Sequence, residues 1–335
     1  MKAAFVKNNE FIIKETLRPA LSGRKGAIVK VSGCGLCGSD IVKLKSPVSP
    51  DGCVLGHEII GEITEINTNT SFTAGSRITA GHHIPCFACR YCLGRSYSMC
   101  RHFKQTNFVP GGFAEYIYLS EEHLNNTAFQ VNMNLSSIEA SFTEPLGCCI
   151  RAVKRADIAD NSKNLIMGLG SIGILMGQAV KASGNEAYGC DILEERVKLS
   201  EKYGFDKSFR YTNEEDALKQ AGKIISDGFD TVFLTAGSAS ALDFAVKAVR
   251  DGGKIIVFSS IRNNGAFKNN EIYYRGLTVI SSYSSSPADL EDAYLLLETG
   301  KVRVLGLSSV YKLEDINDAV NDTLSNKIMK AYIEI

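Results

Sequence analysis

Four cysteines stand close together in the stretch CFACRYCLGRSYSMC, residues 86 to 100. They are Cys86, Cys89, Cys92 and Cys100, with the spacing Cys-x2-Cys-x2-Cys-x7-Cys. Four thiolates without a histidine are typical of a closed, tetrahedral zinc site that leaves no position open for a substrate. Disulfides and an iron–sulfur cluster are the alternatives. The spacing therefore predicts a structural metal site.

A second group of possible metal ligands is scattered along the chain. It consists of Cys37 in GCGLCGSD, His57 and Glu58 in LGHE, and Glu144 in FTEPLG. Taken singly, a buried cysteine, a core histidine and surface carboxylates are the more ordinary interpretation of these residues. Together they supply sulfur, nitrogen and carboxylate oxygen, which suits an open zinc site with room for a substrate oxygen.

A glycine-rich turn predicts a nucleotide site. Gly168-Leu-Gly170-Ser-Ile-Gly173 follows the expected strand KNLIM and opens the expected helix SIGILMGQAVKAS, as the dinucleotide fingerprint requires. Gly168 allows a tight turn, Gly170 lets the backbone approach a pyrophosphate, and Gly173 lets the helix pack on its strand. Ser171 and Ile172 lie in the same turn and belong to the expected cofactor site.

The identity of the nucleotide depends on the residues after the next expected strand. Asp191 ends that strand, and a carboxylate there accepts hydrogen bonds from ribose hydroxyls and repels a 2′-phosphate. We therefore expect NAD. Arg196 leaves NADP open, because an arginine accommodates a 2′-phosphate. FAD is the other alternative, although its fingerprint normally stands at the start of a flavin domain.

Composition narrows the class of partner. Lys+Arg and Asp+Glu both number 37, and no run of like charge is present, so neither nucleic acid nor an anionic membrane is an expected partner. Charges are spread through MKAAFVKNNEFIIKE, which argues against a signal peptide. We expect a cytoplasmic protein whose ten cysteines stay reduced and which acts on a small molecule.

The pattern of expected secondary structure changes twice along the chain. The first 80 residues mix short β-branched runs with turns, whereas strand-like and helix-like segments alternate from about residue 147, which predicts a parallel sheet covered by helices. The 17 uncharged residues between Lys163 and Lys181 are too short and too rich in glycine for a membrane span, so a buried strand–turn–helix is expected. After about residue 284 the first pattern returns.

Several other residues have ordinary interpretations. His82 and His83 precede the cysteine cluster and are expected to be loop or packing residues, because four thiolates already complete that site. The adjacent Cys148 and Cys149 are poorly placed for a disulfide and are expected to pack in the interior. The remaining cysteines are expected to fill the core: Cys34, Cys53 and Cys190.

Taken in order, the motifs resemble those of the medium-chain zinc-dependent alcohol dehydrogenases. GCGLCGSD, LGHE, the four-cysteine stretch, PGGFAEY, EPLG and GLGSIG occur in that family's order over essentially the whole chain. Glu144 stands where alcohol dehydrogenases of this family often have a third zinc cysteine. In this respect the chain is similar to the sorbitol (L-iditol 2-) dehydrogenase branch, which acts on sugar alcohols.

The resemblance implies an α/β fold of two domains with the active site in the cleft between them. Residues 1–146 and 284–335 would form a GroES-like, β-rich catalytic domain, and residues 147–283 a Rossmann domain with a doubly wound parallel sheet. It also implies two zinc ions per chain, NAD as cofactor, and a homodimer or homotetramer.

The resemblance further assigns roles to single residues. Cys37, His57 and Glu144 correspond to ligands of a catalytic zinc, and Glu58 to a position that binds the metal in some members and lies behind it in others. The four clustered cysteines correspond to the structural zinc site. Ser39 corresponds to the hydroxyl that takes the proton of the alcohol.

Two positions depart from the pattern and bear on the substrate. Val42 stands where many members carry a proton-relay histidine, and Lys43 stands where polyol enzymes often carry an aromatic residue. SSYSSSP lacks the arginine with which polyol enzymes hold substrate hydroxyls, so sorbitol itself is less favoured. Lys43 makes an anionic or phosphorylated substrate a hypothesis.

The expected function is oxidation of a secondary alcohol in a polyol, a sugar alcohol or its phosphate to a ketone, with transfer of a hydride to NAD. Threonine, butanediol or a simple alcohol is the alternative substrate. A non-catalytic NAD-binding regulator is the alternative class, and it is disfavoured because Cys37, Ser39, His57 and Glu144 are all retained.

Overall fold

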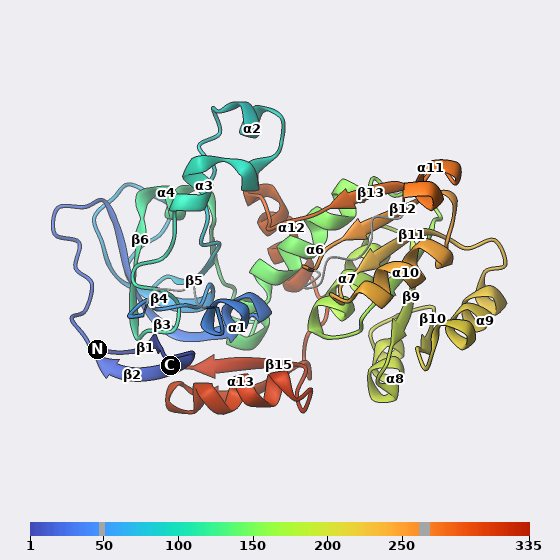
Figure 1. The fold of residues 1–335 in the computed structure, drawn as a ribbon. Helices are drawn as coiled ribbons and strands as arrows, with labels where there is room; N and C mark the ends of the chain where they lie inside the picture. Colours follow the sequence, from blue (N-terminus) through green and yellow to red (C-terminus); the bar gives the residue numbers. More distant parts are fainter. Residues whose placement is uncertain (47–50, 261–268) are drawn as a thin grey trace. The chain divides into compact units, whose positions relative to one another are not determined.

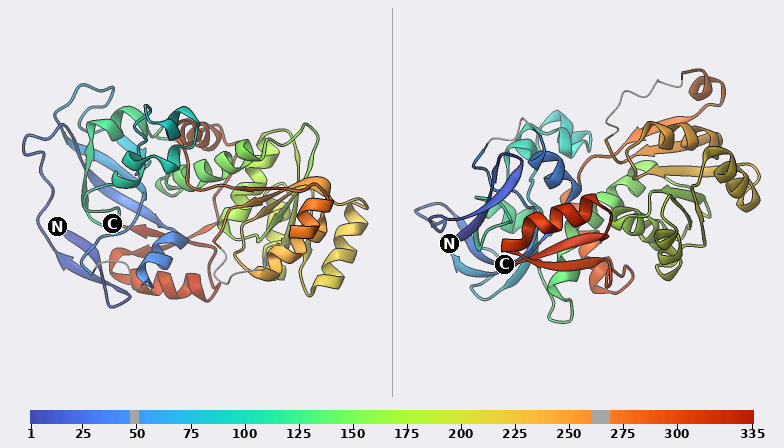
Figure 2. Two further views of the ribbon diagram at one scale, coloured as in Figure 1. Left: turned by 45° about the horizontal axis from the view of Figure 1, so that its top comes forward. Right: turned by 60° about the horizontal axis from the view of Figure 1, so that its bottom comes forward.

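The structure, a computed structural model, describes residues 1–46, 51–260 and 269–335 (Figure 1). The chain divides into two compact units. Unit 1 consists of Met1–Gly147 and Ser285–Ile335, and unit 2 consists of Cys148–Ser284. Both termini lie in unit 1 (Figure 2).

Unit 1 is built around a seven-stranded sheet in the order β14-β15-β3-β4-β5-β7, with β6 pairing to β3. Its central strand β3 (Gly26–Leu36) pairs with β4 (Glu58–Ile66), with β6 (Tyr116–Ser120) and with β15 (Lys330–Glu334), always antiparallel. The other strands of this sheet are β5 (Arg77–Ala80), β7 (Ala128–Gln130) and β14 (Ser308–Lys312). The last strand of the chain therefore lies beside one of the first.

A separate hairpin of β1 (Lys2–Lys7) and β2 (Glu10–Glu15) carries the N-terminus. Asn8 and Asn9 form its two-residue turn with φ values of 52° and 64°. A turn with two left-handed residues matches the twist of the paired strands, and asparagine tolerates that conformation better than most residues.

Helices join the strands of unit 1. Some of them have capped N-termini: α12 begins at Pro287, and the side chain of Ser286 before it accepts the N–H of Asp289 in a capping box. The helices of this unit, with the two 3-10 turns η1 and η2, are α1 (Gly38–Leu44), α2 (Arg90–Leu93), η1 (Tyr97–Met99), α3 (Arg101–Gln105), α4 (Glu121–Asn126), α5 (Ser137–Ser141), α12 (Pro287–Glu298), η2 (Leu313–Asp315) and α13 (Ile316–Leu324). Helices α4 and α5 contact the central strand β3. Helix α6 (Thr143–Ala156) contains the boundary between the units.

Unit 2 holds a six-stranded sheet in the order β10-β9-β8-β11-β12-β13, and each pairing is parallel. The strands are β8 (Lys163–Met167), β9 (Glu186–Asp191), β10 (Lys207–Arg210), β11 (Phe229–Leu234), β12 (Val249–Val257) and β13 (Thr278–Ser281). Counted along the chain this is the order 3-2-1-4-5-6, which defines the dinucleotide-binding sheet. The expected α/β class and Rossmann-type sheet are confirmed.

Helices alternate with these strands, as the sequence pattern predicts. They are α7 (Ser171–Ala182), α8 (Glu194–Lys202), α9 (Glu214–Ile224), α10 (Ala239–Ala248) and α11 (Asn269–Tyr274). The uncharged run after Lys163 forms β8 and α7, and both are largely buried. Within the described ranges, no helix has the length and apolar character that crossing a membrane requires.

Candidate functional site

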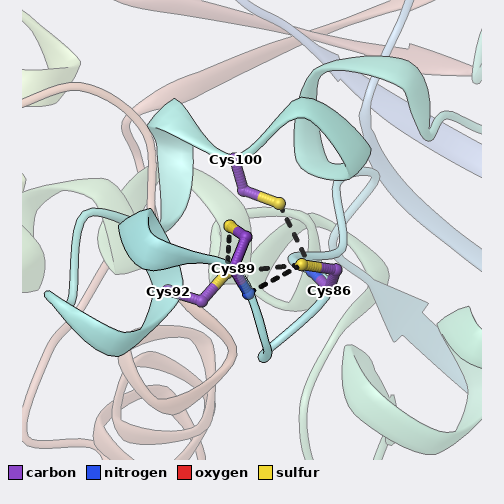
Figure 3. A group of neighbouring side chains, drawn as sticks. All are labelled: Cys86, Cys89, Cys92 and Cys100. Atoms are coloured by element: carbon purple, nitrogen blue, oxygen red, sulfur yellow. Dashed lines mark hydrogen bonds between the residues drawn. The ribbon is translucent and has the colours of Figure 1, made fainter.

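The four clustered cysteines lie together in a loop of unit 1 (Figure 3). All four sulfurs lie within 4.8 Å of one another. Cys92 Sγ lies 3.9 Å from Cys86 Sγ and 3.6 Å from Cys89 Sγ. Four sulfurs around one zinc stand about 3.8 Å apart, because Zn–S bonds of about 2.3 Å meet at tetrahedral angles. The spacing of the sulfurs therefore fits zinc.

None of the ten cysteines forms a disulfide. The N–H of Cys86 donates to Cys100 Sγ at 3.4 Å, and the N–H of Cys89 donates to Cys86 Sγ at 3.4 Å. Burial raises the pKa of Cys100, but donors that include the Cys86 N–H outweigh it and lower that pKa to about 6. Such donors favour the thiolate, which is the form that binds metal.

The loop around this cluster has little core of its own. Only Cys92, Cys100 and Phe103 are buried in its hydrophobic cluster, against which Cys89 and Tyr97 pack. Its regular elements are α2, η1 and α3, each of five residues or fewer. We call residues 86–105 the cysteine lobe.

The second donor set is assembled from α1 and the start of β4. One donor atom each from Cys37, His57 and Glu58 lie within 4.8 Å of one another, and the last two residues are buried. Cys37 caps the N-terminus of α1, where its Sγ accepts the N–H of Ser39 at 3.4 Å. Glu144, on the first turn of α6, reaches the same place: its Oε2 lies 3.9 Å from His57 Nε2.

Asp40 orients the imidazole of His57. Asp40 Oδ1 lies 3.3 Å from His57 Nδ1, while its Oδ2 accepts the N–H of Cys37 at 3.2 Å. A carboxylate on one ring nitrogen fixes the tautomer and leaves the other nitrogen for a metal. Burial lowers the pKa of His57, but Asp40 and Cys37 together outweigh burial and hold that pKa well above its ordinary value. The sequence motif alone did not identify this role of Asp40.

Glu58 forms an ion pair with Lys330, a residue that the sequence analysis did not single out. Lys330 Nζ, on β15, lies 2.5 Å from Glu58 Oε2, and the two side chains are 5% and 0% exposed. Burial lowers the pKa of Lys330, but the negative charges of Glu58, Cys37 and Glu144 outweigh burial and raise it. Apart from this ion pair, neither oxygen of Glu58 has a hydrogen-bond partner among the described residues, so the contact with Lys330 is what compensates the buried charge.

A glycine makes room for this carboxylate. A Cβ placed on Gly35 of β3 would lie 2.0 Å from Glu58 Oε2 and 3.1 Å from Lys330 Cε. Only glycine therefore leaves the ion pair where it is.

The other residues that the sequence analysis singled out differ in how far they are buried. Ser39 and Lys43 are exposed on α1, and Val42 is 52% exposed. His82 and His83 are packing residues, as expected, and the ring of His82 packs directly on His57 with centroids 4.6 Å apart. Cys34, Cys149 and Cys190 are buried. Cys53 is partly buried and packs against the core of unit 1, so it lies at the edge of the core. Cys148 is also only partly buried, which differs from the expected interior position.

The glycine turn of unit 2 has the shape that a dinucleotide needs. Gly168 has φ of 93°, and a Cβ on Gly173 would lie 1.8 Å from Gly168 O, so the turn and the helix start require glycine. Gly170 caps α7, and a Cβ there would meet only Arg196 Nη1 at 3.9 Å. Open space in front of a helix N-terminus fits a pyrophosphate.

Asp191 ties this turn to the next strand. Its Oδ2 accepts the N–H of Leu169 at 2.6 Å, its Oδ1 accepts the N–H of Leu193 at 2.9 Å, and Arg196 Nη1 lies 3.9 Å from Oδ2. Each carboxylate oxygen has a second lone pair, so both oxygens can still accept from ribose hydroxyls.

A Rossmann-type unit, a β-rich unit with two metal-donor sets and a dinucleotide turn together define a zinc- and nucleotide-dependent dehydrogenase. Residues 171–299 match the family "Zinc-binding dehydrogenase", and residues 23–128 match "Alcohol dehydrogenase GroES-like domain". The chain is 30% identical over 353 residues to a sorbitol dehydrogenase of Bacillus subtilis, covering 99% of this chain and 97% of that relative. The chain belongs to the medium-chain zinc-dependent alcohol dehydrogenase family.

Two further relatives agree with this assignment. A D-arabitol-phosphate dehydrogenase of Enterococcus avium is 29% identical over 321 residues, covering 92% of this chain and 89% of that protein. The crystal structure of an Escherichia coli oxidoreductase of unknown specificity has a TM-score of 0.89 at 26% identity, covering 100% of this chain and 99% of that one. The expected family, fold class and enzyme class are confirmed.

Proposed function

We propose that this enzyme oxidises a secondary alcohol of a phosphorylated polyol to a ketone, with NAD as the hydride acceptor. The observation that carries the proposal is the convergence of Cys37, His57 and buried carboxylates at one place, next to a helix that exposes Ser39 and Lys43. Among the relatives, one is named for sorbitol and another for a phosphorylated polyol, which supports this substrate class.

In this proposal Cys37, His57 and Glu144 hold the catalytic zinc, and the four cysteines of the cysteine lobe hold a structural one. Glu58 is given a supporting role and is not one of the three ligands, because Lys330 already neutralises its charge. When bound, zinc would supply Lewis acidity toward the substrate hydroxyl, and NAD would take up the hydride from the carbinol carbon.

Ser39 receives the proton of the alcohol. It follows Cys37 by two residues on the first turn of α1, and its N–H donates to Cys37 Sγ at 3.4 Å, which keeps Ser39 beside the proposed zinc ligand. Residue 42 is a valine, which cannot take up the proton as the relay histidine of other family members does. Because Ser39 is exposed, the proton passes from its Oγ directly to solvent.

Lys43 binds the phosphate. It is four residues after Ser39 on α1, and side chains at that spacing share one face of a helix about 6 Å apart. Its charge acts on the site: burial lowers the pKa of His82 well below its ordinary value, and the positive charges of His57, His83 and Lys43 add to the effect. No ion-pair partner of Lys43 occurs within the described ranges, so its ammonium can meet an anion.

The test is a panel of polyols, their phosphates, amino alcohols and simple alcohols, followed by NADH absorbance. Because a charge-assisted contact is worth about 1.5–3 kcal/mol, Lys43→Ala should lower kcat/KM for polyol phosphates about 10- to 100-fold and leave polyols nearly unchanged. Equal losses on both classes would show that Lys43 does not bind phosphate.

Lys45→Ala is the matched control, because Lys45 stands at the end of the same helix but its Nζ donates to Asn9 O at 3.0 Å. It should leave both substrate classes unchanged. Absence of turnover on the whole panel would favour a regulator, and a preference for amino alcohols or simple alcohols would contradict the substrate class. A higher kcat/KM with NADP than with NAD would contradict the role given to Asp191.

A further inference from the structure

A row of aromatic rings connects the two metal-donor sets of unit 1. It starts at His57, which immediately precedes β4. In the antiparallel pairing of β4 with β5, Ile59 stands opposite Ala80, and extending that register by two residues places His57 opposite His82. The two imidazole centroids lie 4.6 Å apart, with a tilt of 42°.

The row continues from His82 into the cysteine lobe. His82 and His83 have centroids 3.8 Å apart, and His83 and Phe103 have centroids 4.8 Å apart. Phe103 is 2% exposed and packs with Cys92 and Cys100 in the core of the lobe. Three ring contacts thus lead from a ligand of one proposed metal to the sulfurs around the other.

Hydrogen bonds fix both sides of the row. His83 Nδ1 pairs with Thr106 O at 2.6 Å, and the N–H of Ile84 donates to Thr106 Oγ1 at 2.9 Å, so the end of α3 is tied to this segment. On the other side, His123 Nε2 lies 3.1 Å from the carbonyl oxygen of His82. A row so closely packed and anchored leaves little room for one ring to move independently of the next.

We propose that His82 and His83 are positioning residues that couple the metal state of the cysteine lobe to the placement of His57. The inference rests on the assignment of two metals in the proposed function. When the four sulfurs close around their metal, Phe103 and α3 are fixed, and the two rings hold His57 with Nε2 toward Cys37 and Glu144. When the lobe is open, this support is lost and the second metal is held less tightly.

The experiment uses the full chain with zinc in the lobe and Co²⁺ at the Cys37 site. Two quantities are read: the visible absorption band of Co²⁺ and the rate of its release to a chelator. Couplings between sites are commonly about 5- to 150-fold, so Cys100→Ser should shift the band and speed release from the Cys37 site about tenfold or more. His83→Ala should do the same with the lobe metal in place.

The double variant Cys100→Ser/His83→Ala makes the test decisive. If the row carries the coupling, the double variant releases Co²⁺ no faster than the faster single variant, because both changes break the same connection. The proposal would be overturned if the increases in release rate of the two single variants multiplied in the double variant. It would also be overturned if Cys100→Ser left the band and the release rate unchanged.

A second pair of variants covers the case in which Cys100→Ser fails to fold. No hydrogen bond of the His82 ring occurs in the part of the chain that the structure describes, so His82→Phe keeps the ring packing, whereas His82→Ala removes it. Release should be fast in His82→Ala and close to wild type in His82→Phe. Equal rates in the two variants would overturn the ring contacts as the connection.

The control is His102→Ala. His102 lies next to Phe103 on α3, but it pairs with Glu122 at the surface and has no place in the row. It should leave both readouts unchanged. Metal analysis of the wild type separates the two proposals: fewer than two metals per chain would contradict the proposed metal sites, whereas two metals without coupling would contradict only this inference.

Discussion

Lys330 and Glu58 form a buried ion pair whose two members are far apart in the sequence, at the starts of β15 and β4. Breaking such a pair by removing one partner costs about 3–5 kcal/mol, because the other charge stays buried without compensation. We expect Lys330→Met to lower the free energy of unfolding by about that amount in urea titrations of the metal-free protein, and Lys330→Arg to lower it less.

Lys327→Met is the matched control. Its ammonium pairs with Asp322 at 3.0 Å, but the side chain is 70% exposed, and exposed pairs contribute about 0–1 kcal/mol. If Lys330→Met and Lys327→Met were equally stable, the buried pair would not contribute as described.

Single residues show what the sequence could and could not predict. Cys37, His57 and Glu58 stand in recognisable motifs, and the structure brings donor atoms of all three together. Asp40 and Lys330 were missed for different reasons. Asp40 lies inside a motif, but its contact with His57 depends on a ring orientation. Lys330 lies in no motif, and it meets Glu58 only because β15 pairs with β3.

Under the proposed function, the cysteine lobe is the element that should depend most on metal. Its buried cluster is small and its helices are short, so we expect metal binding to supply much of its folding free energy. We expect Cys89→Ser to make the lobe accessible to trypsin, with cleavage after Arg90, Arg95 or Arg101 at least about tenfold faster than in wild type. Mass spectrometry of the early fragments locates the cuts.

Cys37→Ser is the comparison for this experiment. It removes a donor from the other site, so turnover should be abolished while the lobe stays as resistant to trypsin as in wild type. Unchanged resistance in Cys89→Ser would contradict a structural metal in the lobe.

The regular elements of unit 2 were predictable because their pattern is local. KNLIM is buried from its second residue to its last and becomes β8, and Gly168 after it has the positive φ that the tight turn requires. The pairings of unit 1 were less predictable, since β3 collects partners from both ends of the chain through contacts that no sequence period records.

At the scale of the molecule, unit 1 is discontinuous and unit 2 is one continuous stretch with its own core. Deleting residues 330–335 would remove β15 from between β14 and β3, together with the buried Ala331 and Ile333. We expect hydrogen exchange to show lost protection in β3 and β4 and retained protection in β8, β9 and β11, because each unit has its own core.

Deleting Ile335 alone is the control, since that residue lies outside β15 and contributes one backbone hydrogen bond to Ser32 and a partly buried side chain. It should cost β3 and β4 much less protection than the longer deletion and leave β8, β9 and β11 unchanged. Equal loss of protection in both units after the longer deletion would show that unit 2 needs unit 1 in order to fold.

The position of the Glu58 carboxylate depends on a residue without a side chain, Gly35. The carboxylate of Glu58 beside Lys330 occupies the space that a side chain at residue 35 would need. A methyl group at residue 35 would displace the carboxylate and change its distance to both the lysine and the metal donors. For protein engineering, this means that a substitution at residue 35 would disturb the site from a neighbouring strand, with every chemically active residue left in place.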